Sequence, residues 1–199
     1  MPIKIKRACT MKILETDRLI LRTFQATDED QMALIDQDPK VCQYLPAIGT
    51  RASTEASVQR IIQHYEEHGF SLYAVELKNS GEFIGFLGLI TPSFQAHFTP
   101  AIEIGWRLAS QHWNKGYATE GAKAVLHHGF LQLGLDEIVS FTVVNNRASR
   151  RVMEKIGLHH HPQVDFDHPR LPADSSLRRH VLYRLSKTEY LKNQSLCHF

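Results

Sequence analysis

The amino-acid sequence predicts an α+β (mixed α/β) domain in which a mixed sheet is flanked by helices. Strand-like and helix-like segments follow one another in the order β-α-α-β-β-β-α-β-α-β, which is not a regular βα alternation. The 199 residues are 43% hydrophobic, which is enough for one buried core. No repeat, low-complexity segment or linker divides the chain. We therefore expect one domain over residues 13–192, preceded by a disordered extension at residues 1–12 and followed by a tail at residues 193–199.

The first third of the chain predicts one strand and two helices. Residues 18–24, RLILRTF, have the apolar pattern of a strand. A helix is predicted over residues 27–35, where TDED offers a capping box and Pro39 provides the stop. A second helix is predicted over residues 53–68, because apolar side chains recur there at helical spacing and Gly69 can end it.

The rest of the chain alternates between strand and helix periodicity. Two strands at residues 70–77 and 82–90 flank the sequence KNSG, a pattern typical of a hairpin. The remaining predicted elements are a strand at 101–108, a helix at 116–133 ended by Gly134, a strand at 137–144, a helix at 146–157, a strand at 178–186 and a terminal helix capped by SKTE.

Charge and cysteine content exclude several classes of protein. The formal net charge of +2 gives no support to nucleic-acid binding or to a membrane-surface role. The long uncharged run at residues 83–102 contains two prolines and several polar residues, so it is not expected to span a membrane. Cys9, Cys42 and Cys197 are far apart and form no C-x-x-C pair, which fits a reducing, cytoplasmic location.

The segment WRLASQHWNKGYATEG contains a polar elbow between a predicted strand and a predicted helix. The start of a helix exposes backbone N–H groups and partial positive charge. Gly116 allows a ligand to approach the backbone closely, and Lys115 adds a full charge. This elbow therefore predicts a phosphate site, although a plain helix cap is the alternative. The sequence is neither a Walker loop nor a dinucleotide-binding fingerprint.

A second block, NNRASRRVMEKIGL, follows the strand at 137–144. Taken together with the elbow and with the opening LETDRLILRTF, it resembles the GNAT acyl-CoA N-acetyltransferases. The resemblance is to the branch that contains the ribosomal-protein N-terminal (alanine) acetyltransferases. It covers nearly the whole chain, and the three blocks stand in the family's order and spacing. One departure is Trp113, which occupies the family's Gln or Arg position and is common in this branch.

The resemblance implies a fold and a cofactor site. The fold is a splayed mixed sheet whose fourth and fifth predicted strands part to admit acetyl-CoA as co-substrate. The pantetheine arm is then expected along the strand at 101–108, with Trp106 and Leu108 as contacts. The expected cofactor contacts in the elbow and beyond it are Asn114, Lys115, Gly116, Tyr117, Ala118, Thr119 and Asn146.

The same resemblance suggests the groups that handle protons. Glu103 matches a glutamate that serves as general base elsewhere in the superfamily, while an outward-facing strand carboxylate is the alternative. The usual acidic tyrosine is replaced by Met153, and Ser149 is the substitute that the ribosomal branch suggests. Ser149 could instead bind only the cofactor or its own helix backbone. An oxyanion donor is expected at Gly105 or Trp106, where family members have a bulge.

The acceptor is predicted to be a primary amine, with the N-terminal α-amine of a protein or peptide as the best candidate. Neutralising a lysine amine at pH 7 costs about 4.6 kcal/mol, whereas an α-amine costs only about 1–1.4 kcal/mol. A small amine such as an amino sugar, polyamine or amino acid is the alternative acceptor, and a non-catalytic acyl-CoA-binding regulator is the alternative function. Dimers are frequent in this branch, so a homodimer is an expectation without a readable interface.

The twelve histidines do not predict a metal site. His64 and His68 stand four residues apart, but Tyr65 occupies the position of the zinc-protease glutamate and no third ligand is indicated. His159, His160 and His161 could contact a transition metal, although an exposed polar edge is the simpler interpretation. Residues 165–176 contain prolines and aspartates and predict a mobile loop over the acceptor site.

Overall fold

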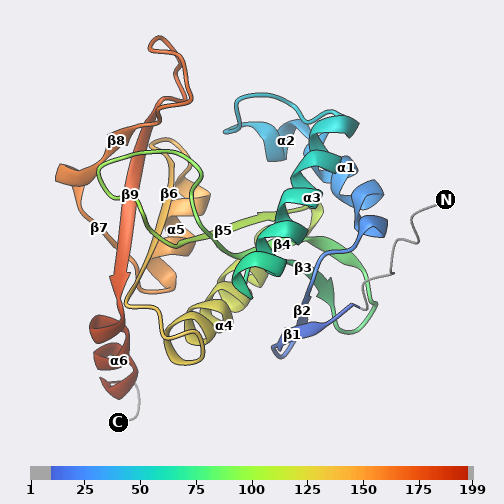
Figure 1. Ribbon diagram of the computed structural model, residues 1–199, viewed down its shortest axis with the longest axis horizontal. Helices are drawn as coiled ribbons and strands as arrows, with labels where there is room; N and C mark the ends of the chain where they lie inside the picture. Colours follow the sequence, from blue (N-terminus) through green and yellow to red (C-terminus); the bar gives the residue numbers. More distant parts are fainter. Residues whose placement is uncertain (1–9, 197–199) are drawn as a thin grey trace.

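The computed structural model describes residues 10–196 of the chain, and these form a central sheet with helices on both faces (Figure 1). The elements, in chain order, are β1 (Lys12–Glu15), β2 (Leu19–Arg22), η1 (Ala26–Asp28), α1 (Glu29–Asp36), α2 (Pro39–Cys42), α3 (Arg51–His68), β3 (Leu72–Leu77), β4 (Phe83–Ile90), β5 (Glu103–Leu108), η2 (Ser110–His112), α4 (Tyr117–Leu131), β6 (Glu137–Val143), α5 (Arg147–Lys155), β7 (His159–His160), η3 (Pro162–Val164), β8 (Phe166–Asp167), β9 (Arg179–Ser186) and α6 (Lys187–Leu196).

The sheet has the strand order β1-β2-β3-β4-β5-β6-β9-β7, with β8 paired to β9. All neighbouring strands are antiparallel except β5 and β6, which are parallel. This arrangement confirms the predicted mixed sheet of the α+β class. Among the described residues, no helix is long and apolar enough to cross a membrane.

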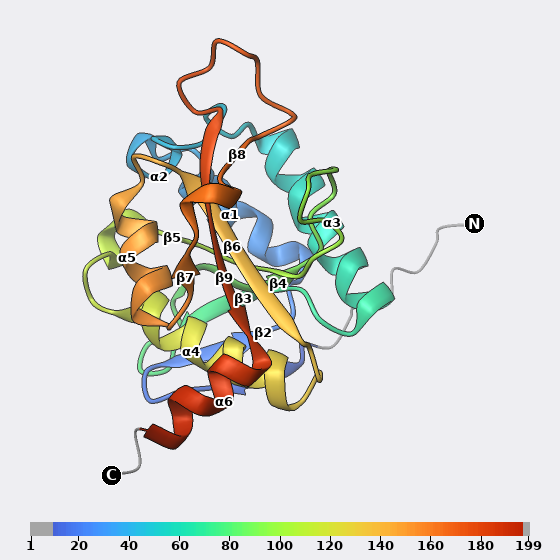
Figure 2. The same cartoon turned by 90° about the vertical axis from the view of Figure 1, so that its left-hand side faces the viewer.

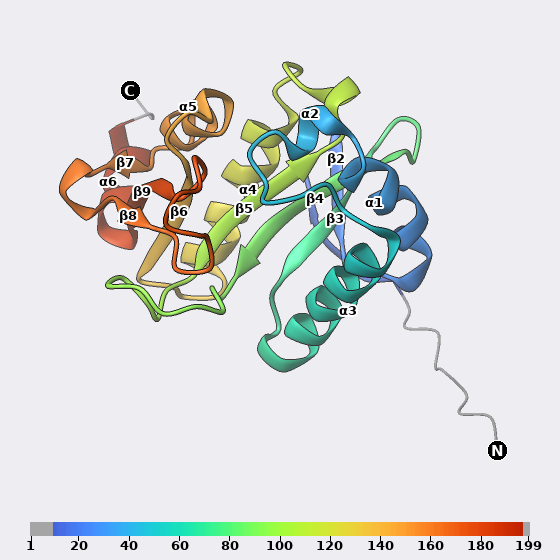
Figure 3. The ribbon, with the colours of Figure 1, turned by 90° about the horizontal axis from the view of Figure 1, so that it is seen from above.

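Two hydrophobic layers cover opposite faces of the sheet. The larger layer packs α4, α5 and α6 against strands from both halves of the sheet, and its buried members include Leu87, Ile104, Val125 and Tyr183. The second layer packs α1 and α3 against β3 and β4. Seen from above, α1, α2 and α3 lie over one half of the sheet, β6 to β9 form the other half, and β5 lies between them (Figure 3).

A third, aromatic cluster covers the β6–β9 half of the sheet on the face that α1 and α3 leave free. Its buried members are Phe98, Val139, Phe166 and Leu182, and Phe94, Ala96, Ala101, Phe141 and Val164 pack against them. Phe98 comes from the β4–β5 loop and lies 4.9 Å from Phe166 of β8, centroid to centroid. The β4–β5 loop therefore covers this part of the sheet, whereas helices cover the rest of it.

Several boundaries differ from those that the sequence predicts. Pro39 does not end a helix but occupies the first position of α2, where its missing N–H costs nothing. The cap at the start of the first helical segment comes from Gln25 and Asp28, because the Gln25 N–H donates to the Asp28 carboxylate at 2.9 Å. The short strands β1, β7 and β8 are absent from the prediction.

The long helix α3 begins slightly earlier than the sequence predicts and ends where it predicts. Thr50 and Ser53 cap α3 reciprocally, so its first residue is Arg51 and not Ser53. Gly69 ends the helix in the left-handed region at φ 75°. The predicted domain limits stay a prediction, since α6 extends to Leu196 and residues 1–9 and 197–199 lie outside the described part.

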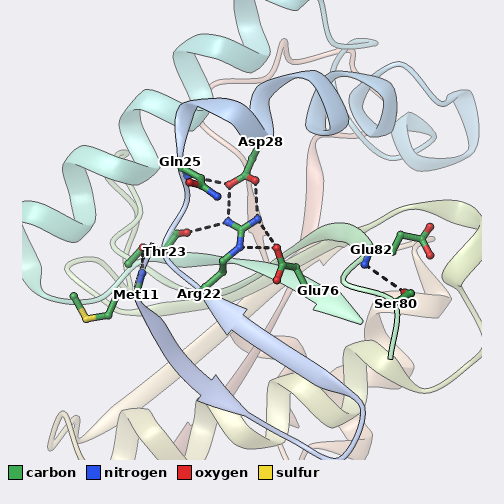
Figure 4. A network of polar contacts seen from close by, with 8 residues as sticks. All are labelled: Met11, Arg22, Thr23, Gln25, Asp28, Glu76, Ser80 and Glu82. Carbon is green, nitrogen blue, oxygen red and sulfur yellow. Dashed lines mark hydrogen bonds and ion pairs between the residues drawn. The ribbon is translucent and has the colours of Figure 1, made fainter. Parts of the chain in front are cut away.

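A buried ion-pair network joins β2 to the first helical segment and to β3 (Figure 4). The guanidinium of Arg22 donates to both carboxylate oxygens of Asp28 at 2.7 Å. Arg22 also donates to Glu76 of β3 at 2.7 Å. Arg22 and Asp28 are only 6% and 5% exposed, so neither charge can be solvated if its partner is removed.

We expect Asp28→Ala to lower the free energy of unfolding by about 3–5 kcal/mol, because it leaves the buried Arg22 charge only partly paired. Urea denaturation measures this loss directly. Asp30→Ala is the matched control, since Asp30 is exposed and pairs with Arg51 at the surface. Equal losses in the two variants would contradict a structural role for the buried pair.

Candidate active site

The strands β5 and β6 meet at one end and then diverge. Their parallel pairing consists of one register pair, Glu103 with Val139, at the start of both strands. By contrast, β5 pairs with β4 from Glu103 to Leu108, and β6 pairs with β9 from Glu137 to Val143. The sheet is therefore splayed between β5 and β6, as the resemblance implies, and the opening widens towards the C-terminal ends of these strands.

The backbone of β5 turns polar groups towards this opening. The Ala109 N–H donates to the Ile84 carbonyl at 2.9 Å. In an antiparallel pair every second residue bonds to the neighbouring strand, so the residues of β5 that bond to β4 are the odd-numbered ones. The N–H and C=O groups of Ile104, Trp106 and Leu108 consequently point towards β6. Ser140 Oγ donates to the Ile104 carbonyl at 2.8 Å, and Trp113 Nε1 donates to the Leu108 carbonyl at 2.7 Å.

The backbone N–H and C=O of Trp106 therefore face the opening. On either side of them, the carbonyls of Ile104 and Leu108 already accept hydrogen bonds from Ser140 and Trp113. This fits the predicted contact of Trp106 with an extended pantetheine arm, whose amides can pair as a strand does. The carbonyl of Leu108 already accepts a hydrogen bond from Trp113, and its N–H points to the same opening. The predicted bulge at Gly105 or Trp106 is wrong, because the register of β5 with β4 runs without a shift.

The elbow enters α4 in a strained conformation that glycine makes possible. Gly116 is the residue before the first helical turn and has φ 83°, while Asn114 has φ 61°. These left-handed residues turn the chain sharply into α4. The N–H groups of Tyr117, Ala118 and Thr119 in the first turn have no intrahelical acceptor. The elbow thus directs backbone donors and the positive end of a fifteen-residue helix to one point.

Arg18 supports the elbow from β2's N-terminal side and is a residue that the sequence interpretation missed as part of the site. Its Nη1 donates to the Lys115 carbonyl at 2.9 Å, and its Nε donates to Glu120 at 2.6 Å. The guanidinium lies 4.6 Å from the centre of the Tyr117 ring. Both partners stand in the quoted motifs, the arginine in LETDRLILR and the glutamate in YATEG. Their contact could not be predicted from the sequence because they are 102 residues apart.

The start of α5 lies on the other side of the opening, after β6. Asn146 caps this helix, because its Oδ1 accepts the Ser149 N–H at 3.1 Å. Its Nδ2 donates to Thr142 at 3.0 Å, which leaves one N–H of the amide for a cofactor. Ser149 is half-buried, whereas Met153 is 1% exposed and belongs to the core. Ser149 is therefore the member of this pair whose side chain can reach a ligand.

Glu103 stands where β5 and β6 meet, on the sheet face opposite α4. Ile104 and Leu108 point into the α4 layer, so Glu103, Gly105 and Arg107 point to the other face. A Cβ on Gly105 would lie 3.7 Å from Glu103 Oε1, which shows that the carboxyl leans along the strand towards Gly105. All three residues are half-buried on this face.

The surroundings of Glu103 favour its protonated form. Burial raises the pKa of the Glu103 carboxyl to about 8. No arginine, lysine or histidine of the described chain forms an ion pair with it. A carboxyl with a pKa near the working pH is suited to take a proton from an amine and to release it again.

The raised pKa of Glu103 predicts how stability depends on pH. Between pH 4.5 and about 8 the folded protein holds a proton that the unfolded chain releases, so stability falls as pH rises through this window. Glu103→Gln removes the effect. We expect the Tm difference, variant minus wild type, to increase from pH 4.5 to about 8 and to be constant above pH 8, as measured by calorimetry. A Tm difference that is constant with pH would contradict the assignment.

The histidines take part in other interactions. Within residues 10–196, no group of three or more His, Cys, Asp or Glu side chains is arranged to hold a metal ion. His64 Nδ1 lies 2.8 Å from the Phe70 carbonyl, and His160 Nε2 lies 2.9 Å from Asp165. The β8–β9 loop projects beyond the end of the sheet (Figure 2). It is linked to the β4–β5 loop because Arg170 donates to Ser93 Oγ at 3.0 Å.

A splayed mixed sheet, a backbone edge facing the opening and a helix start aimed at one point define an acyltransferase that binds an acyl-CoA. Comparison with known proteins agrees. Residues 18–159 match the family model described as an acetyltransferase (GNAT) domain. The chain belongs to the GNAT acetyltransferase family, and it is an acetyl-CoA-dependent N-acetyltransferase.

Individual relatives support the same assignment. The chain is 33% identical over 149 residues to the uncharacterized N-acetyltransferase YoaA of Bacillus subtilis, covering 73% of this chain and 81% of YoaA. A GNAT-family acetyltransferase from Bacillus anthracis superposes with a TM-score of 0.73 at 25% identity, covering 88% of this chain and 99% of that one. A ribosomal L7/L12 α-N-protein acetyltransferase in complex with coenzyme A shares the fold, with a TM-score of 0.70 at 16% identity over 88% of this chain and 98% of that one.

Proposed function

We propose that this protein acetylates the α-amine of a protein or peptide N-terminus, with Glu103 as the group that receives the amine's proton. The observation that carries the proposal is the half-buried Glu103 carboxyl, which leans towards Gly105 at the junction of β5 and β6. An α-amine loses its proton near pH 7.7–8.0, close to the pKa of about 8 for Glu103. The α-N-protein acetyltransferase that shares this fold supports the same acceptor class.

Each residue of the proposed site has a role that follows from its position around the β5–β6 opening. The N–H groups at the start of α4, together with Lys115, would bind the pyrophosphate of acetyl-CoA. The Trp106 backbone would align the pantetheine arm, and Asn146 would contribute its remaining N–H. Acetyl-CoA supplies the thioester carbonyl that the amine attacks.

Proton transfer completes the proposed reaction. The new C–N bond forms as the C–S bond breaks, so the amine loses one proton and the CoA thiolate gains one. Glu103 takes the proton from the amine, directly or through water. Ser149 is the side chain proposed to hydrogen-bond the departing thiolate and to relay a proton to it from water, so that the serine ends the step neutral. The hydroxide that remains takes the proton held by Glu103, which restores the carboxylate. A thiol with a pKa near 8.5 gives a thiolate that can leave without a strong acid.

A thiol-release assay tests the acceptor class. The protein is supplied with acetyl-CoA and with peptides that have free or blocked N-termini and no lysine. Polyamines, amino sugars and free amino acids form the second set of acceptors. Faster release with free N-termini than with blocked ones supports the proposal. Release with the small amines alone would replace it with the small-amine function.

A further inference from the structure

A pocket of about 430 Å³ opens beside β5 on the same face as Glu103. The residues that line it come from the end of α1, the loop before α3, one side of α3 and β5, and the polar ones are Asp36, Ser53, Ser57, Arg60 and Arg107. This volume is in the range of sites that hold small molecules or a few residues of peptide. The proposed function assigns no ligand to the pocket.

The charges that line the pocket sum to a net positive value. Asp36 is the one acidic side chain of the lining, and it is 5% exposed. Its carboxylate is already bonded, because Arg107 Nη1 donates to Oδ1 at 2.6 Å and Thr54 Oγ1 donates to Oδ2 at 2.8 Å. Arg107 is thus neutralised by Asp36, which leaves the guanidinium of Arg60 as a positive charge without an acidic partner in the pocket.

Arg60 is oriented along the pocket side of α3. Its Nη2 donates to Ser57 Oγ at 2.7 Å, and Ser57 also lines the pocket. The remaining N–H groups of the guanidinium are available for a bidentate bond to a carboxylate or phosphate. Arg107 has a side chain that is 28% exposed, so it can donate a further hydrogen bond to the same anion.

Strand geometry sets the distance from the reacting amine to the Arg107 edge of the pocket. The carboxyl of Glu103 leans towards Gly105, and Arg107 is two residues further along the same face. Two residues of strand span about 7 Å. In a free α-amino acid the amine and carboxylate are separated by two bonds, which is less than about 3 Å and is too short to reach both sites.

We propose that the pocket binds an anionic group of the acceptor, which lies about 7 Å or more from the amine that is acetylated. This inference rests on the proposed function and narrows its substrate class. An acidic side chain at the second or third position of an N-terminal peptide has this separation. A free ω-amino acid of similar length has the same chemistry, and the test distinguishes the two sources.

The test compares acceptors that differ in one charge. Wild-type protein and acetyl-CoA are given the amidated peptides Ala-Glu-Ala, Ala-Gln-Ala and Ala-Lys-Ala, and 6-aminohexanoate. We expect kcat/KM to be roughly tenfold higher for the Glu peptide than for the Gln peptide, and lowest for the Lys peptide. Preference for 6-aminohexanoate over the Glu peptide would assign the pocket to a free small acid.

Variants connect the preference to the pocket. Arg60→Gln should reduce the preference for Glu over Gln to about twofold or less, because the neutral amide cannot pair with the carboxylate. Arg60→Glu should favour the Lys peptide. Arg51→Gln is the matched control, because Arg51 is on the same helix, is exposed and pairs with Glu55 and Asp30 outside the pocket. Arg51→Gln should keep the wild-type preference.

The outcomes separate this inference from the proposed function. Equal kcat/KM for the Glu and Gln peptides in the wild type would overturn the anion site while leaving N-terminal acetylation intact. A preference that survives Arg60→Gln would also overturn it. Absence of acetylation for every acceptor, with acetyl-CoA still bound, would overturn the proposed function and the anion site together.

Discussion

Gly116→Asp is expected to weaken acetyl-CoA binding by roughly 100-fold, which corresponds to about 2.7 kcal/mol. Gly116 has φ 83°, a conformation that costs an L-residue energy. A Cβ there would lie 3.3 Å from Arg18 Nη2, so the new carboxylate would compete for the arginine that bonds the Lys115 carbonyl. It would also place a negative charge where phosphates are proposed to bind. Calorimetric titration with acetyl-CoA measures the effect.

Gly134→Asp separates an effect that is local to the elbow from the general effect of an added charge and backbone strain. Gly134 follows the other end of α4 and has φ 73°, and a Cβ added there would have no atom within 4 Å. The variant has a similar backbone penalty and the same added charge, but it lies far along the helix from the elbow. We expect its Kd for acetyl-CoA to match the wild type. A similar loss of binding in both variants would contradict a phosphate site at the elbow.

Glu103→Gln is expected to lower kcat/KM for amine acceptors by roughly 100-fold, because the amide cannot accept the proton of the amine. In the wild type, the reactive form is the ionised carboxyl, so activity should rise with pH and level off above about 8. An acceptor whose amine is already neutral at pH 6 removes the amine's own titration from the profile. With that acceptor, the variant should show a flat profile.

The binding of acetyl-CoA is the control for this variant, since the proposed phosphate and pantetheine contacts do not involve Glu103. We expect the Kd to be unchanged in Glu103→Gln. Glu137→Gln is the matched strand variant, because Glu137 is on the neighbouring strand and pairs with Arg184 at the surface. Loss of activity in Glu137→Gln equal to that in Glu103→Gln would indicate a general structural effect.

The long periodic elements were predictable because their own residues carry the pattern. α3 and α4 bury one face each, β9 is buried on both faces along most of its length, and Gly69 marks the end of α3 in the sequence as in the structure. The strands β7 and β8 have two residues each, which is too short for any periodicity, and they exist because β9 offers them an edge. Pro39 was misread because proline both ends and begins helices.

The candidate site was predictable in part. The elbow and Asn146 stand in local motifs, and the structure brings them to the two sides of the β5–β6 opening. Arg18 and the pocket around Arg60 were not predicted, because they depend on contacts between segments far apart in the chain. The bulge in β5 was carried over from the family and contradicted by the regular register with β4.

Hydrogen–deuterium exchange with and without saturating acetyl-CoA tests the central claim most directly, because it reports which backbone N–H groups the co-substrate covers. We expect protection of β5 around Trp106 and of residues 114–119 at the elbow, with no change in the β3–β4 turn at residues 78–81. Protection at the elbow and β5 together would support binding in the β5–β6 opening. Unchanged exchange at both segments, with acetyl-CoA bound, would contradict it.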